Sequence, residues 1–218
     1  MVFGISCFRK MMNDFSKILD YKGIIFDLDG TLIDSMKYHI KAWQEVAARY
    51  GVNLSYEYLH SHGGVPSIKI AQEIVHNYHL EETAYCLAGQ KTEKYVSYIP
   101  MIEIYPMARE LMDFAKLHGI RMIIATGTLK SNVEKIMSRT DLGCYIRDVV
   151  SSEDVMNHKP APDTFCVAAE RIGVSCCDSI VFEDAPLGIQ AAKNGNFDCC
   201  VVKDGTFDLN KIIHATTY

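Results

Sequence analysis

Two short acidic segments each follow a run of apolar residues. Asp27 and Asp29 come after one such run, and Glu183 and Asp184 come directly after another. At the end of a strand, residues two apart point the same way, and Gly30 lets the chain turn with its amides free to meet an anion. Taken singly, each acidic pair is explained as well by turn or capping hydrogen bonds.

A hydroxyl group and a lysine extend this set of polar residues. Thr126 and Gly127 follow a third apolar run, where free amides beside a helix start would suit an anion. Lys159 precedes Pro160 and Pro162, which stiffen the backbone around it. Taken singly, an N-cap threonine and a solvated loop lysine are equally good interpretations.

These residues can act together only if the fold brings them to one place. Short apolar runs alternate with helical patterns along the chain, which is typical of parallel strands buried on both faces. We predict strands over 23–26, 121–125, 148–150, 179–182 and 198–202, and helices over 107–118, 161–172 and 186–194. The fold class is therefore α/β, with a Rossmann-like doubly wound parallel sheet whose strand ends converge on a ligand crevice.

One interval, between residues 35 and 100, contains no convincing strand. Its apolar residues follow helical spacing, as between Met36 and Tyr50. We predict an inserted all-helical cap domain over 36–100 and a core over 20–35 and 101–218; the alternative is extra helices packed on the sheet. Residues 1–19 are interpreted as a peripheral N-terminal extension, either a short helix or disordered.

The composition excludes several classes of protein. The chain has 218 residues, 49% apolar and 22% charged, with a net charge of −5. No apolar run reaches the ~18 residues of a membrane helix, and no basic field suggests nucleic acid. We therefore expect neither a membrane nor a nucleic acid as partner. The eight cysteines lack zinc spacing, which favours reduced thiols and a cytoplasmic location.

Four carboxylates at one edge of a sheet would repel each other, by about 1 to 4 kcal/mol per pair at a separation of about 4 Å. A bound cation would offset this repulsion, and a few hard oxygen ligands with room for water and phosphate favour Mg²⁺ over zinc. The predicted metal ligands are Asp27, Asp29, Glu183 and Asp184. A metal and Lys159 together would make this acidic site attractive to a phosphate.

The order of these segments resembles the four motifs of the haloacid dehalogenase-like phosphohydrolase superfamily, from residue 21 to about 203. The matching segments are 27–31, Thr126, 159–163 and 182–184 with 188–192. The helical insert is similar to the small four-helix cap of the subgroup that contains β-phosphoglucomutase and sugar phosphatases. Within that subgroup, segments 39–43, 159–165 and 182–185 are similar to those of phosphatases that act on fructose 1-phosphate.

The resemblance implies a Mg²⁺-dependent phosphatase that acts through an aspartyl-phosphate. Asp27 would be the nucleophile, and Asp29 would protonate the leaving alcohol and then deprotonate the water. Thr126, Gly127 and Lys159 would bind the phosphate oxygens. Mg²⁺ would be held by Asp27, Asp184 and the main-chain carbonyl of Asp29, with Glu183 nearby. Asp29 argues against dehalogenase chemistry, because the dehalogenases of the family lack this second aspartate. The implied substrates are small phosphorylated metabolites, especially sugar phosphates such as fructose 1-phosphate. We also expect a monomer or a weak homodimer.

The resemblance also suggests which cap residues meet the substrate: His39, Gly64, Lys69 and Lys91. A hexose-phosphate mutase of the β-phosphoglucomutase type is the main alternative, because His39 and Lys91 fall where that enzyme has a hinge histidine and a cap lysine. The mutase usually has an arginine in the cap loop, whereas this chain has Pro66 and Ser67 there and only Lys69 follows.

A signalling receiver domain that is phosphorylated on aspartate is a further alternative, because it also uses Mg²⁺, a threonine and a lysine at strand ends. Receivers place the acidic pair first and the lysine last. Here Lys159 precedes Glu183 and Asp184, and receivers carry no helical insert.

Overall fold

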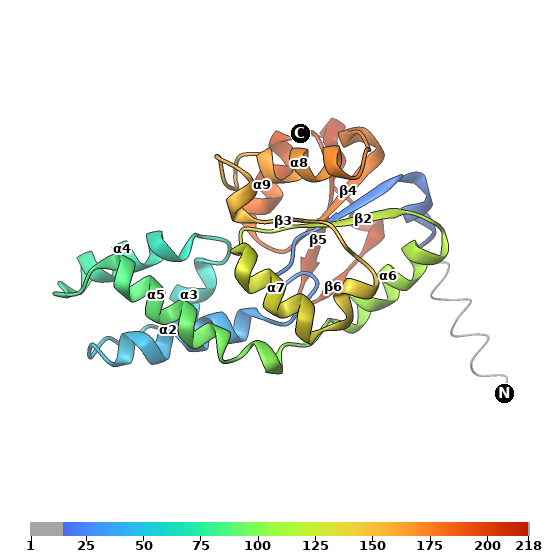
Figure 1. The fold of residues 1–218 in the computed structure, drawn as a ribbon. Coiled ribbons are helices and arrows are strands. Elements are labelled where there is room, and N and C mark those ends of the chain that lie inside the picture. The colour runs from blue at the N-terminus through green and yellow to red at the C-terminus, as the bar shows by residue number, and fades with distance from the viewer. Residues whose placement is uncertain (1–14, 218) are drawn as a thin grey trace.

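A six-stranded sheet forms the centre of the computed structural model, which describes residues 15–217. The strands are β1 Gly23–Phe26, β2 Arg121–Ala125, β3 Val149–Val150, β4 Ser179–Glu183, β5 Asp198–Lys203 and β6 Thr206–Phe207. Their order is β3-β2-β1-β4-β5-β6, and the first five are parallel (Figure 1). The predicted parallel sheet is confirmed. The antiparallel strand β6 was not predicted, because two residues are too short to show a period.

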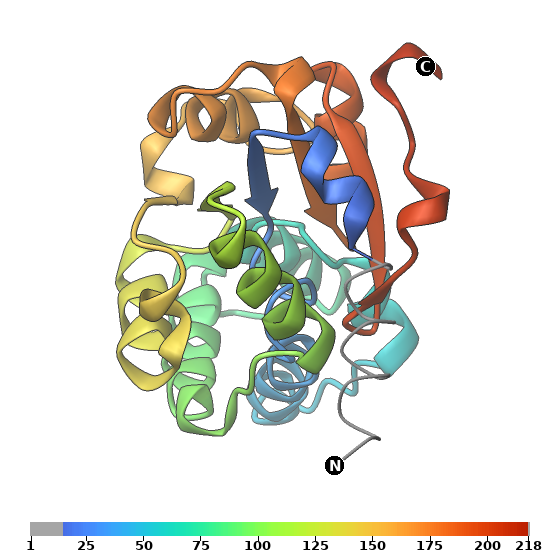
Figure 2. The same cartoon turned by 90° about the vertical axis from the view of Figure 1, so that its right-hand side faces the viewer.

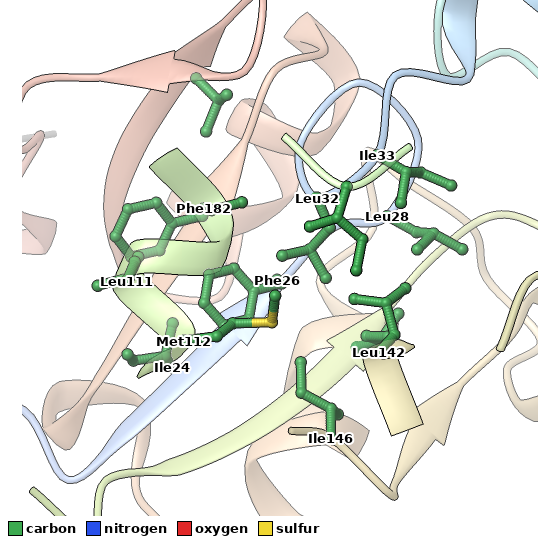
Figure 3. Close-up of a cluster of buried hydrophobic side chains, with 14 of the residues drawn as sticks. Ile24, Phe26, Leu28, Leu32, Ile33, Leu111, Met112, Leu142, Ile146 and Phe182 are labelled. Carbon is green, nitrogen blue, oxygen red and sulfur yellow. The ribbon is translucent and has the colours of Figure 1, made fainter. Parts of the chain in front are cut away.

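Helices cover both faces of this sheet. On one face, Ile24 and Phe26 of β1 pack against Leu111 and Met112 of α6 (Pro106–Leu117) (Figure 3). Helix α7 (Lys130–Arg139) contributes buried side chains to the same cluster. On the other face, Ile25 of β1 lies in a cluster with buried side chains of α8 (Asp163–Arg171) and α9 (Pro186–Asn194). Successive side chains of β1 thus enter opposite clusters, which is the doubly wound arrangement predicted.

The cap consists of four helices and lies to one side of the sheet (Figure 1). The helices are α2 Met36–Ala48, α3 Tyr56–Ser61, α4 Ser67–Asn77 and α5 Ala84–Val96. They share an apolar cluster of their own that includes Trp43 and Leu87. The insert is therefore a cap rather than a set of extra helices on the sheet. Its limits at 36 and 100 remain a prediction, because Ala42 and Tyr95 pack into the cluster of the core.

The two chain connections between core and cap lie side by side. Ile33 and Ile104 form an antiparallel bridge, the amide of Asp34 donates to the carbonyl of Glu103 at 3.0 Å, and the amide of Tyr105 donates to the carbonyl of Leu32 at 2.9 Å. Two adjacent connections form a natural hinge for movement of the cap.

Both ends of the described chain pack on the core. The short helix expected near the N-terminus is present as a 3-10 helix over Ser16–Asp20, but it is not peripheral: Phe15 and Ile18 are buried, and the Phe15 ring contacts that of Phe114 at a centroid distance of 5.8 Å. Residues 1–14 of the predicted extension lie outside the described residues. At the other end, Ile213 pairs with Cys199 of β5. Figure 2 shows the C-terminal segment running along the outside of the core.

The seven cysteines that the structure describes are all free thiols, as predicted. No helix between residues 15 and 217 is long and apolar enough to cross a membrane.

Candidate active site

The predicted site residues gather around a cavity of about 800 Å³ between the carboxyl ends of the strands and the cap. From the core it is lined by Asp27, Asp29, Thr126, Gly127, Lys159, Glu183 and Asp184. From the cap it is lined by His39, Gly64 and Lys91, among apolar side chains such as Trp43. Parallel strands explain the convergence, because their carboxyl ends meet at one edge of the sheet.

A buried ion pair lies at the base of the cavity. The Lys159 Nζ is 2.6 Å from Asp27 Oδ1 and 3.3 Å from Glu183 Oε1, and the lysine side chain is only 8% exposed. The ring of Phe165 packs beneath the ammonium at 4.7 Å. Although burial opposes the charged form, the two carboxylates raise the pKa of Lys159. The lysine therefore stays protonated and can bind an anionic oxygen.

Three carboxylates form a group that could hold a metal. One oxygen from each of Asp27, Glu183 and Asp184 lies within 4.8 Å of the others, and the Thr31 hydroxyl donates to Asp184 at 3.1 Å. The expected cluster of four is thus a cluster of three, because the Asp29 carboxylate lies outside it. The main-chain carbonyl of Asp29, rather than its side chain, remains a predicted metal ligand.

Burial and mutual repulsion disfavour the charges in this group. Burial and the nearby Glu183 charge raise the pKa of Asp27 to about 8. Burial, followed by the neighbouring carboxylates, raises the pKa values of Glu183 and Asp184 to about 7. Three carboxylates share one ammonium, so a positive charge is still needed for all of them to ionise. All three donors are hard oxygens, so the group fits Mg²⁺.

The Asp29 carboxylate is instead surrounded by hydrogen-bond donors. Ser35 Oγ donates to it at 2.6 Å, and Thr128 Oγ1 and Tyr95 Oη also donate to it. His39 Nε2 lies 3.2 Å from it. Although burial opposes ionisation, the hydrogen bonds from His39, Ser35 and Thr128 hold the pKa of Asp29 well below its usual range. Ser35, Thr128 and Tyr95 were not assigned to the site from the sequence.

His39 connects Asp29 to the cap lysine. The Lys91 Nζ is 2.7 Å from His39 Nδ1 and donates to Ser67 Oγ at 3.3 Å. An ammonium can only donate, so Nδ1 accepts and Nε2 carries the proton that faces Asp29. The His39 ring is stacked on that of Tyr95 at 3.8 Å. Burial lowers the pKa of Lys91 to about 8.

Of the remaining predicted residues, Thr126 and Gly64 line the cavity and Lys69 does not. Thr126 is buried at the cavity, and its Oγ1 accepts the amide of Thr128 at 3.1 Å, so its own hydroxyl proton can be donated to a phosphate. Gly64 has φ +79°, and a Cβ there would lie 3.3 Å from Ala185 of the core. Lys69 is exposed on α4 and does not line the cavity.

The chain is similar to known phosphatases along most of its length. A family model described as haloacid dehalogenase-like hydrolase matches residues 24–202. Fructose-1-phosphate phosphatase YqaB of Escherichia coli is 37% identical over 185 residues, which cover 84% of this chain and 97% of the relative.

Solved structures agree with this similarity. A haloacid dehalogenase hydrolase of family IA, variant 3, from Entamoeba histolytica superposes with a TM-score of 0.74 at 27% identity, covering 82% of each chain. β-Phosphoglucomutase from Clostridium difficile has a TM-score of 0.71 at 25% identity, covering 82% of this chain and 83% of that one. The sheet, the cap and the family match together lead to one conclusion: the chain belongs to the haloacid dehalogenase-like hydrolase family.

Proposed function

We propose that the protein is a Mg²⁺-dependent phosphatase that hydrolyses monophosphate esters of small sugars such as fructose 1-phosphate. The observation that carries this proposal is the contact between Asp27 and Lys159 beside the group formed by Asp27, Glu183 and Asp184. This contact supports the proposal because Asp27 would be the nucleophile and Lys159 the anion-binding cation, beside three carboxylates that would hold the metal at the base of one cavity. The fructose-1-phosphate phosphatase of E. coli supports the choice of substrate.

The reaction has two steps, each of which uses residues of this chain. Asp27 attacks the phosphorus atom, the ester P–O bond breaks, and the leaving alkoxide takes a proton from Asp29. Asp29 must therefore carry a proton when the ester binds, although its hydrogen-bond donors hold its pKa low. Asp29 then takes a proton from a water molecule, which attacks the phosphorus of the aspartyl-phosphate and restores Asp27. Thr126, Gly127 and Lys159 hold the oxygens of the transferred phosphoryl group in both steps.

The metal would be held by Asp27, Asp184 and the main-chain carbonyl of Asp29, with Glu183 nearby. When bound, Mg²⁺ would offset the charge of the carboxylates and of the phosphate. Asp27 could then be ionised and still approach an anionic substrate.

The cavity supports a small leaving group. Its volume of about 800 Å³ is within the usual range for small-molecule sites, and the cap covers it with Trp43, Leu59 and Val65. A covered site excludes bulk water, which strengthens the electrostatic contacts to the phosphate.

The mutase is the second candidate, because β-phosphoglucomutase has a similar fold. A mutase must also hold a second phosphate at the cap side. Among the cavity-lining residues, Lys91 is the only lysine or arginine that the cap contributes, and its ammonium is already bonded to His39 and Ser67. Lys69 lies elsewhere on the surface. The site therefore favours hydrolysis. Family membership replaces the receiver-domain interpretation.

A panel of sugar phosphates tests the proposal. The full chain is incubated with fructose 1-phosphate, glucose 1-phosphate and glucose 6-phosphate, with Mg²⁺ or with a chelator, and both released phosphate and isomerised sugar phosphate are measured. We expect Mg²⁺-dependent phosphate release that the Asp27→Asn variant lacks. Isomerisation without phosphate release would favour the mutase, and no turnover of any ester would contradict both.

We also propose a cellular location and an oligomeric state for the protein. Seven free thiols support a reducing compartment such as the cytoplasm. We expect a monomer or weak homodimer, which sedimentation velocity would test.

A further inference from the structure

Gly188 lies beneath the carboxylate that holds the active-site lysine. It is the third residue of α9, it is buried, and it faces Glu183 at the end of β4. A Cβ at residue 188 would lie 1.5 Å from Glu183 Oε1, 2.1 Å from Cδ and 2.4 Å from Cγ. Real Cβ atoms essentially never approach other heavy atoms this closely, so any side chain at this position would occupy the space of the Glu183 carboxylate.

The backbone gives no reason for a glycine here. Gly188 is inside an α-helix and does not have the left-handed φ seen at Gly30, which has φ +88°. Alanine forms helices better than glycine, so helix stability alone would favour alanine at this position. The space needed by Glu183 is therefore the reason that the structure offers.

The place of Glu183 matters because both of its oxygens are used. Oε1 accepts from Lys159 Nζ at 3.3 Å, and Oε2 accepts from the amide of Asp184 at 2.9 Å. Lys159 in turn bonds to Asp27 at 2.6 Å. Glu183 is 1% exposed, so a displaced carboxylate could not reach water without a larger rearrangement.

We propose that Gly188 is a positioning residue: its missing side chain makes the space in which Glu183 aligns Lys159 against Asp27. The placement of Glu183 is independent of which ester is hydrolysed, but its effect on turnover rests on the proposed phosphatase function. Gly188 itself is not among the residues that line the cavity, so it acts on the site only through Glu183.

A double-mutant cycle on thermal stability tests the steric part without any need for activity. We expect Gly188→Ala to lower Tm by about 3 to 10 °C in the wild-type background. In the Glu183→Ala background, where the carboxylate is absent, the same substitution should leave Tm unchanged or raise it. Gly143→Ala is the control, because the nearest atom to a Cβ there is 3.8 Å away. If Gly188→Ala alone does not fold, folding of the double variant supports the proposal.

The functional part is tested by rescue. Gly188→Ala should lower kcat/KM for fructose 1-phosphate at least about 10-fold and weaken the rise in Tm caused by Mg²⁺. Adding Glu183→Asp, which shortens the side chain by one methylene, should restore part of both relative to Gly188→Ala alone. Equal Tm losses in the two backgrounds, or unchanged turnover and Mg²⁺ response, would overturn the proposal. If the wild type hydrolyses no ester while the Tm cycle shows coupling, the proposed function fails and the steric role of Gly188 stands.

Discussion

Asp27 and Asp29 lie two residues apart at the end of β1, yet their surroundings are opposite. Asp27 meets a buried lysine and two further carboxylates, all from the core, and burial together with the Glu183 charge raises its pKa to about 8 although Lys159 opposes the shift. Asp29 meets hydrogen-bond donors from both core and cap, which keep its pKa low despite burial. The chemical role of a carboxylate at a strand end is therefore set by the groups that surround it, and not by its spacing along the strand.

The difference divides the site into two parts. The surroundings of Asp27 are complete in the core, so they persist whatever the position of the cap. The surroundings of Asp29 include His39 and Tyr95 from the cap, so they depend on the cap being in place. We infer that the nucleophile is preorganised by the core, whereas the proton-transfer group responds to the cap.

We expect the largest loss of turnover from a substitution of Asp29, which separates its role in proton transfer from the role of Asp27 in nucleophilic attack. Asp29→Asn should lower kcat/KM for fructose 1-phosphate by about 10³-fold, because kcat/KM covers the steps up to release of the alcohol, in which the leaving alkoxide loses its proton donor. The loss should be much smaller with p-nitrophenyl phosphate, whose leaving group needs no proton. Steady-state kinetics on both esters measure this, with Asp178→Asn as a surface control. Equal losses on both esters would remove Asp29 from the role of acid.

Removal of the cation beside Asp27 should have the next largest effect. Lys159→Met should lower kcat/KM by about 10²-fold, because a phosphate oxygen loses its buried ammonium. Unlike Asp29→Asn, this loss should be similar for both esters. Lys22→Met, which removes an exposed partner of Asp178, is the matched control. A loss confined to fructose 1-phosphate would contradict the assignment of Lys159 to the phosphate.

A smaller effect tests the contribution of the cap to Asp29. Tyr95→Phe removes one neutral donor and should lower kcat about 3- to 10-fold. Tyr98→Phe removes a hydroxyl that bonds to Glu45 outside the cavity and should leave kcat unchanged. If both variants behave alike, the Tyr95 hydroxyl does not act on Asp29.

The smallest effect is on stability rather than on turnover. Lys91 is buried without a carboxylate in contact, and burial lowers its pKa to about 8 from an ordinary value of 10.5. Below pH 8 the folded protein carries the full cost of this buried charge. Between pH 8 and 10.5 the folded state loses the proton before the unfolded state does, so the cost disappears.

Lys91→Met should therefore raise the free energy of unfolding at pH 7 by about 1 to 3 kcal/mol, with the gain shrinking above pH 8. Denaturant unfolding at pH 7 and pH 10 measures this. Lys94→Met on the same helix, which removes an exposed ion pair with Glu45, should give no such gain. Destabilisation by Lys91→Met at pH 7 would contradict this expectation, because it would show that Lys91 stabilises the folded state.

The features that were predicted best from the sequence depend on short segments of the chain, namely strands and motif residues. Strands β1 and β2 match the predicted ranges, because buried parallel strands are short continuous apolar runs. Asp27 and Lys159 were predicted to meet because each follows from a motif and from the parallel topology. The packing of Phe15 and the edge strand β6 left no periodic signal to detect.

Side-chain direction could not be predicted from the motifs. Asp29 was expected to join the other carboxylates, but its side chain meets Ser35 and Thr128 instead. Tyr95 is 66 residues from Asp29 and carries no signal that links the two. Gly188 was noted as part of a motif, but only the coordinates show that Glu183 occupies the space beside it.

The role of Asp27 as the nucleophile can be tested directly by trapping its phosphorylated form. The enzyme can be quenched in acid during turnover of fructose 1-phosphate, reduced with borohydride and digested, and its peptides analysed by mass spectrometry. Borohydride converts an aspartyl-phosphate to homoserine, so we predict homoserine at position 27 and at no other aspartate. Homoserine at another position, or none at any position while phosphate is being released, would contradict the account.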